Sequence, residues 1–153
     1  MSAELSSGRL VVLDTNVLIS LYVFADSRFA PLRHHIEAGR WQAVTNQACL
    51  AEFVRVLNYP MFKLSAEAQV VALAEYQNMV RTISAPAQSA IRVLLPRCTD
   101  ADDQKFLELA RDSGAKCLVT SDKALLKLSR RLMKSGMFQV ITPSAALAEI
   151  SPA

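Results

Sequence analysis

Carboxylate side chains at the ends of two apolar segments are the first residues of this chain that could support chemistry. Asp14 directly follows the apolar residues 10–13, and Asp122 stands two residues after the stretch 116–120. If both stretches are parallel strands, both carboxylates emerge at the carboxyl edge of one sheet, where open α/β sheets bind their ligands. We therefore expect a site at that edge.

A further acidic cluster, Asp100, Asp102 and Asp103, precedes a helical stretch that leads back into segment 116–120. Two carboxylates about 4–5 Å apart repel one another by roughly 3–4 kcal/mol at an effective dielectric constant of 20. A fold that gathers three of them needs a compensating cation or raised pKa values. Such oxygen ligands suit Mg²⁺ or Mn²⁺ better than zinc.

Each of these aspartates also has a purely structural explanation. Helical stretches follow Asp14, Asp102 or Asp103, and Asp122, and Asp is favoured there as an N-cap and as a partner of the helix dipole. Taken singly, each is better explained as a cap. Taken together on one edge, they favour a metal site.

Glu52 is a fourth candidate, and the residues alone leave its role open. It lies in the almost wholly apolar helical stretch 48–54. It could be a metal ligand or a solvated side chain paired with Arg55, an interaction worth only a few tenths of a kcal/mol. The pair with Arg55 is slightly favoured on this basis.

Basic residues follow Asp122 directly, in segment 123–134, which contains no acid. Helical spacing places four of them along one side: Lys123, Lys127, Arg130 and Lys134. Such a stripe could follow the phosphate backbone of a nucleic acid. The alternative is an ordinary solvated helix face, which the position beside the acidic edge makes less attractive.

Other catalytic classes are disfavoured. The four glycines form neither a GxxxxGK nor a GxGxxG arrangement, which argues against a P-loop or a dinucleotide-binding fold. His34 and His35 lack Cys or acid partners at the spacing that a zinc site or a Ser–His–Asp triad requires. Asp14 lacks the second Asp expected of an aspartyl-phosphate phosphatase.

The elements that must position these residues indicate one doubly wound α/β domain, with a parallel sheet of about five strands flanked by helices. Apolar runs at 10–13, 41–44, 116–120 and 138–141, and a weaker one at 79–83, alternate with segments of helical periodicity. Gly39, Gly114 and Gly136 each stand between such a helix and a strand. Repeated helix–Gly–strand units imply right-handed crossovers. Thr142 and Pro143 should begin a terminal helix.

Composition sets broader bounds. The net charge of +3 favours a polyanionic partner only weakly. Three separated cysteines, Cys49, Cys98 and Cys117, predict reduced, buried thiols in a cytoplasmic protein. The N-terminal residues lack the pattern of a signal peptide and no apolar stretch nears the ~20 residues of a membrane span, so we expect neither. We expect a flexible or disordered N-terminus at 1–8 and a single domain at 9–150.

Together these residues resemble the motifs of the PIN-domain nucleases, particularly the short stand-alone ribonuclease toxins of bacterial and archaeal toxin–antitoxin pairs. The likeness extends over roughly residues 9–150, and four weak motifs in the right order make it specific. In chain order, the matching residues are Asp14, Thr15 and Asn16 after an apolar strand, Glu52 in a helix, Asp103 with Ala110 seven residues later, and Thr120 with Asp122.

The resemblance implies dependence on Mg²⁺ or Mn²⁺, RNA as the substrate, a homodimer, and a small antitoxin protein over the acidic edge. It also implies that Glu52 is a direct or water-mediated metal ligand. Asp100 and Asp102 flank Asp103, and either could assist a second ion. Thr15, Asn16 and Thr120 would orient the carboxylates.

The resulting hypothesis is a cytoplasmic metal-dependent endoribonuclease, the toxin of a pair, in which Asp14, Glu52, Asp103 and Asp122 hold one or two ions. One alternative is a non-catalytic RNA-binding or scaffold domain of the same fold, which has no need of four uncompensated acids. Another is a DNA-directed, structure-specific nuclease, although the chain lacks the arch and clamp segments of such relatives. Segment 59–65 is either a contact for partner or substrate or an ordinary turn between helices.

Overall fold

The sheet at the centre of the molecule has five parallel strands in the order β3-β2-β1-β4-β5. The computed structural model describes residues 8–84 and 94–150. The strands are β1 (Arg9–Leu13), β2 (Trp41–Thr45), β3 (Arg81–Thr82), β4 (Cys117–Val119) and β5 (Gln139–Ile141). The predicted fold class is therefore confirmed. The N-terminus predicted at 1–8 lies, apart from Gly8, outside the described residues.

Eight α-helices and several shorter turns connect the strands within the described ranges. The helices are α1 (Thr15–Leu18), α2 (Ala30–Glu37), α3 (Gln47–Leu57), α4 (Ala66–Met79), α5 (Gln104–Ser113), α6 (Lys123–Leu126), α7 (Ser129–Lys134) and α8 (Pro143–Ile150). A π-helical turn, Ile19–Val23, continues α1, and 3-10 turns occur at Ser27–Phe29, Pro60–Phe62 and Ala101–Asp103. Segment 59–65 is thus the connection between α3 and α4.

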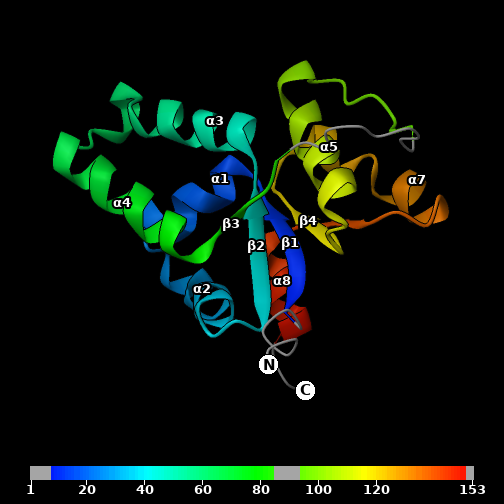
Figure 1. Ribbon diagram of the computed structural model, residues 1–153, viewed down its shortest axis with the longest axis horizontal. Coiled ribbons are helices and arrows are strands. Elements are labelled where there is room, and N and C mark those ends of the chain that lie inside the picture. The colour runs from blue at the N-terminus through cyan, green and yellow to red at the C-terminus, as the bar shows by residue number, and fades with distance from the viewer. Residues whose placement is uncertain (1–7, 85–93, 151–153) are drawn as a thin grey trace.

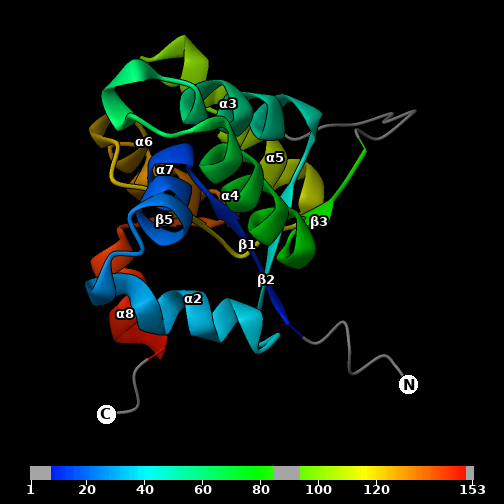
Figure 2. The ribbon, with the colours of Figure 1, turned by 90° about the vertical axis from the view of Figure 1, so that its left-hand side faces the viewer.

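Both faces of the sheet are covered, because alternate residues of each strand point to opposite sides. On one face, Val11 and Val119 belong to a core built with α1, α2, α3, α4 and α8. On the other, Val12 and Leu118 pack with α5, α6 and α7. Figure 1 shows α2 and α4 on one side of the sheet and α5 and α7 on the other. In Figure 2, α2 and α8 lie side by side, away from α3 and α6.

Local sequence signals account for several element ends. Gly114 closes α5 in the left-handed region with φ 73, which only glycine adopts readily. The Thr142 hydroxyl accepts a hydrogen bond of 3.0 Å from the Ala145 N–H and so caps α8. The weak strand predicted at 79–83 exists but is shorter, because Met79 still belongs to α4.

The helical spacing on which the basic stripe of 123–134 was placed does not continue through the whole segment. The segment forms two short helices, and α6 ends at Leu126 before α7 begins at Ser129. Leu128 is buried in the second core, and its N–H donates to the Leu125 carbonyl at 3.0 Å, only three residues back. Packing of this leucine therefore tightens the chain and interrupts the helix.

Two further expectations concern the molecule as a whole. Cys49, Cys98 and Cys117 are all buried and free of disulfides, as predicted. In the part of the chain that the structure describes, no helix combines the length and the apolar character that crossing a membrane requires.

Candidate functional site

The carboxyl ends of β1 and β4 form the edge at which the acidic residues meet. These two strands are neighbours in the sheet, with Leu13 paired to Val119, although they are far apart in the chain. From β1 the chain moves outward to β2 and β3, and β4 and β5 lie on the opposite side of β1. The order of strands reverses here, and ligands of doubly wound sheets bind at such a switch point.

Asp14 lies at this edge, directly after β1, and is almost completely buried. Its N–H donates to the Val119 carbonyl at 3.0 Å, which extends the pairing of β1 with β4 by one residue. It occupies the N-cap position of α1, yet its side chain makes no capping hydrogen bond. Capping alone therefore does not explain this carboxylate, although the Asn16 N–H at the start of α1 favours its charged form.

Thr120 links Asp14 to Asp122. Its hydroxyl donates to Asp14 Oδ2 at 2.5 Å and accepts a hydrogen bond of 2.9 Å from the Asp122 N–H. Burial raises the pKa of Asp14, the Thr120 hydrogen bond and the Asn16 N–H lower it, and the charges on Glu52 and Asp122 raise it further. The predicted orienting role of Thr120 fits this geometry.

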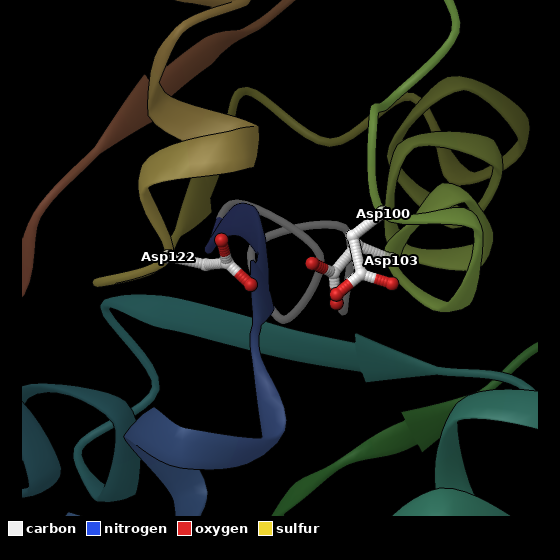
Figure 3. Close-up of side chains that lie close together, drawn as sticks. All are labelled: Asp100, Asp103 and Asp122. Carbon is white, nitrogen blue, oxygen red and sulfur yellow. The ribbon is translucent and has the colours of Figure 1, made fainter.

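Asp100, Asp103 and Asp122 form a compact group whose ligand oxygens lie within 4.8 Å of one another. Figure 3 shows Asp122 facing the neighbouring carboxylates of Asp100 and Asp103. Asp100 and Asp122 also act as caps, because Asp100 Oδ1 accepts from the Asp102 N–H at 3.0 Å and Asp122 Oδ1 accepts from the Ala124 N–H at 2.8 Å. For these two aspartates, the structural and the functional explanations both apply.

Asp103 is the most unusual member of the group. Its side chain makes no capping hydrogen bond, the residue is only 8% exposed, and its Oδ2 has no hydrogen-bond partner among the described residues. Burial, then a side-chain hydrogen bond with Asp122, and then the charges of Asp122, Asp14 and Asp100 raise its pKa to about 8. A buried oxygen without a donor, beside three further carboxylates, suits a divalent cation with oxygen ligands.

Glu52 approaches the same region from α3, but other side chains already contact its carboxylate. Oε2 accepts a hydrogen bond of 2.6 Å from the Thr15 hydroxyl. Oε1 lies 2.5 Å from Lys105 Nζ and 3.7 Å from a guanidinium nitrogen of Arg55. The pair with Arg55 exists, as one of the two interpretations held, but the closer cation is Lys105.

Lys105 is the residue of this region that the sequence analysis missed. It lies near the start of α5, two residues after Asp103, and its ammonium reaches Glu52, which is 53 residues earlier in the chain. Its position directly after an acidic cluster could have drawn attention to it. The partner could not have been found from spacing.

The structure thus brings Asp14, Asp103 and Asp122 to one edge and adds Asp100 to them, while Glu52 lies beside them in an ion pair. Asp102 is exposed and does not belong to the compact group of acids in the described residues. Thr15 is buried against Glu52, and Asn16 is exposed. All four basic residues predicted to bind nucleic acid are exposed: Lys123, Lys127, Arg130 and Lys134.

A family model described as PIN domain matches residues 10–124. That range contains all four predicted acidic residues: Asp14, Glu52, Asp103 and Asp122. No curated protein matches the chain significantly.

Proposed function

Because the chain belongs to the PIN-domain family, whose members are generally metal-dependent nucleases, we propose that it is a metal-dependent endoribonuclease. The observation that carries this proposal is the Asp103 carboxylate. It is buried, its Oδ2 lacks a partner among the described residues, and it lies within a compact group of aspartates at the switch point of the sheet. A catalytic cation accounts for this arrangement, which a scaffold domain would not need.

The proposed ligands are Asp14, Asp103 and Asp122. Asp100 and Glu52 lie beside them at the same edge of the sheet. The ion is Mg²⁺ or Mn²⁺, since the donors are all carboxylate oxygens. When bound, it supplies Lewis-acid chemistry, because it lowers the pKa of water and neutralises charge on the scissile phosphate.

The protein's own contribution is to hold the carboxylates in place before substrate arrives. Thr120 fixes the orientation of Asp14 through its hydroxyl, and the Ala124 N–H fixes that of Asp122. Thr15 holds Glu52. Side chains that are already oriented lose little conformational freedom when they bind a cation or substrate, which favours tight binding.

The substrate proposed is RNA, and its phosphate backbone would contact the basic residues of α6 and α7. Lys123 directly follows Asp122, and the side chains of Lys127, Arg130 and Lys134, further along α6 and α7, are exposed as well. Phosphate contacts of this kind position a nucleic acid without reading its sequence. The preference for RNA over DNA rests on the resemblance to ribonuclease toxins.

We further propose that the protein is the toxin of a cytoplasmic toxin–antitoxin pair and forms a homodimer. The support is its likeness to the short stand-alone members of the family, together with three buried thiols suited to a reducing compartment. A small antitoxin would then cover the acidic edge. If so, expression of the chain alone should arrest growth, and coexpression of a small protein encoded beside it should restore growth.

Cleavage of matched RNA and DNA oligonucleotides with Mn²⁺ or Mg²⁺ tests the activity. Asp14→Asn should lower RNA cleavage by more than about 100-fold, because loss of a ligand should exceed the 10–100-fold typical of residues that only orient one. The amide keeps an acceptor for Thr120, so thermal unfolding of the metal-free protein should change little. Asp26→Asn is the matched control, since Asp26 lies outside the acidic edge and pairs with Arg28.

Three other outcomes of this cleavage experiment would each contradict part of the proposal. Full activity of Asp14→Asn would remove Asp14 from the site. Cleavage of DNA alone would identify a DNA-directed nuclease. If neither nucleic acid is cut and Mn²⁺ does not raise the unfolding temperature, the chain is a non-catalytic domain of this fold.

A further inference from the structure

Lys105 supplies a positive charge inside the acidic edge itself. Its Nζ lies 2.5 Å from Glu52 Oε1 and donates to the Asp102 carbonyl at 2.7 Å. Its side chain is 21% exposed and that of Glu52 only 12%, so the pair is largely shielded from water. A lysine ammonium has three donors, and two of them are directed at these oxygens.

Glu52 consequently has no carboxylate oxygen without a donor. Thr15 donates to Oε2, and Lys105 occupies Oε1. A divalent ion at Glu52 would lie close to the ammonium, and the two like charges would repel in a partly buried space. Asp103 contrasts with Glu52, because its Oδ2 is buried and has no partner among the described residues.

The acidic edge is therefore divided into two parts with different charge compensation. Around Glu52, the protein neutralises the carboxylate with its own cation. At the Asp100, Asp103 and Asp122 group, whose oxygens lie within 4.8 Å of one another, the charge is compensated by a bound proton or by an external cation. Thr15 follows Asp14 in the chain, so the two parts adjoin.

We propose that Lys105 is a built-in counter-ion that keeps Glu52 from acting as a metal ligand and limits the site to one divalent ion. That ion is held by the ligands proposed above, Asp14, Asp103 and Asp122, with Asp100 beside them. The inference rests on the proposed function and defines the metal content of that same site. Lys105 is a positioning residue, because it acts through Glu52.

Removal of the charge should release Glu52 and create a second place for an ion beside Asp14. Lys105→Met removes the ammonium and retains an unbranched side chain, and Lys105→Gln is a second neutral variant in case the first does not fold. Lys105→Arg keeps the charge. Arg55→Met is the matched control, because Arg55 is the other cation near Glu52 but lies 3.7 Å away and is 58% exposed.

The number of Mn²⁺ ions bound by each metal-free protein, measured without nucleic acid by titration calorimetry and by the electron spin resonance signal of free Mn²⁺, is the readout. The wild type, Lys105→Arg and Arg55→Met should each bind one ion. The two neutral variants should bind two, and adding Glu52→Gln to either should restore one. Circular dichroism checks that each variant is folded.

Two ions on the wild type, or one ion on both neutral variants, would overturn the proposal. A second ion that persists after Glu52→Gln would also overturn it, because the ion would then not depend on Glu52. No Mn²⁺ binding by the wild type would instead contradict the proposed nuclease function, so the two failures are distinguishable.

Discussion

Aspartates that occupy similar positions before helices have different roles in this molecule. Asp100 and Asp122 accept capping hydrogen bonds from the backbone, and these bonds would persist without a metal ion. Asp14 and Asp103 also occupy cap positions, but Asp103 makes no capping bond, and at Asp14 the only contribution from a helix N–H is the effect of Asn16 on its pKa. Their burial costs free energy that helix capping does not offset, so a cation is the simplest compensation for them.

At this scale we expect Asp103→Asn to change how stability depends on pH. In the metal-free protein the pKa of Asp103 is raised from 3.8 to about 8, so the folded state holds a proton that the unfolded state releases. Its contribution to stability is full below about pH 4 and is lost as the pH rises through about 8. The Asp103→Asn variant has no carboxyl group to titrate here, so its stability does not fall in this way. It should therefore be more stable than the wild type at high pH.

Urea unfolding of both proteins in chelator, from about pH 5 to about pH 8.5, measures the difference. Mn²⁺ should stabilise the wild type more strongly as the pH rises, because the ion competes with the proton, and should stabilise the variant little. Parallel pH profiles for the two proteins would show that Asp103 does not titrate as described.

At the scale of elements, short turns decide where each functional side chain emerges. Gly114 ends α5 and allows the chain to enter β4 at once, which places Thr120 and Asp122 at the carboxyl edge. At Leu128, by contrast, burial of one side chain interrupts a segment whose periodicity favours a single helix. At Gly114 the backbone geometry therefore agrees with the sequence pattern, whereas at Leu128 side-chain packing overrides the helical spacing.

Gly114→Ala should lower the free energy of unfolding by about 1–2 kcal/mol, the cost of a left-handed conformation for an ordinary residue. An added Cβ would meet nothing within 4 Å, so the loss comes from the backbone alone. Gly114→Asn should lose less, since asparagine tolerates this conformation better. Urea unfolding measures both. Equal losses, or a change in Mn²⁺ affinity, would contradict this explanation.

At the scale of the whole molecule, the order of strands creates the site. β1 and β4 are far apart in the chain but adjacent in the sheet, so the residues after each strand meet. The same arrangement places the exposed basic residues of α6 and α7 directly after Asp122. A phosphate backbone that follows them would lead to the acidic edge.

Replacing Lys123, Lys127, Arg130 and Lys134 by glutamine should weaken binding of single-stranded RNA in chelator. The slope of log affinity against log salt should fall by about 0.7 for each phosphate that the variant no longer neutralises, whereas Mn²⁺ binding should be unchanged. Fluorescence anisotropy across a salt series measures the slope. Arg40→Gln with Lys116→Gln is the control, because both exposed residues directly precede strands at the opposite edge of the sheet. An unaltered slope in the fourfold variant would show that these residues do not bind the phosphate backbone.

The sequence by itself determined the parallel sheet, the helices that flank it, and the edge at which Asp14, Asp103 and Asp122 emerge. These features follow from local patterns, since apolar runs, glycines after helices and residues directly after strands are all defined within a few positions. The roles of the individual acids as ligands stay a prediction.

Only the tertiary structure decided that Asp100 joins the compact group, that Glu52 pairs with Lys105, and that the basic segment is two helices. Each depends on side chains that meet across long stretches of chain or on how one leucine packs. Glu52 and Lys105 come from α3 and α5, and no local pattern encodes the distance between two helices. Charge compensation is a property of that distance, because electrostatic energy depends on separation and burial rather than on position in the sequence.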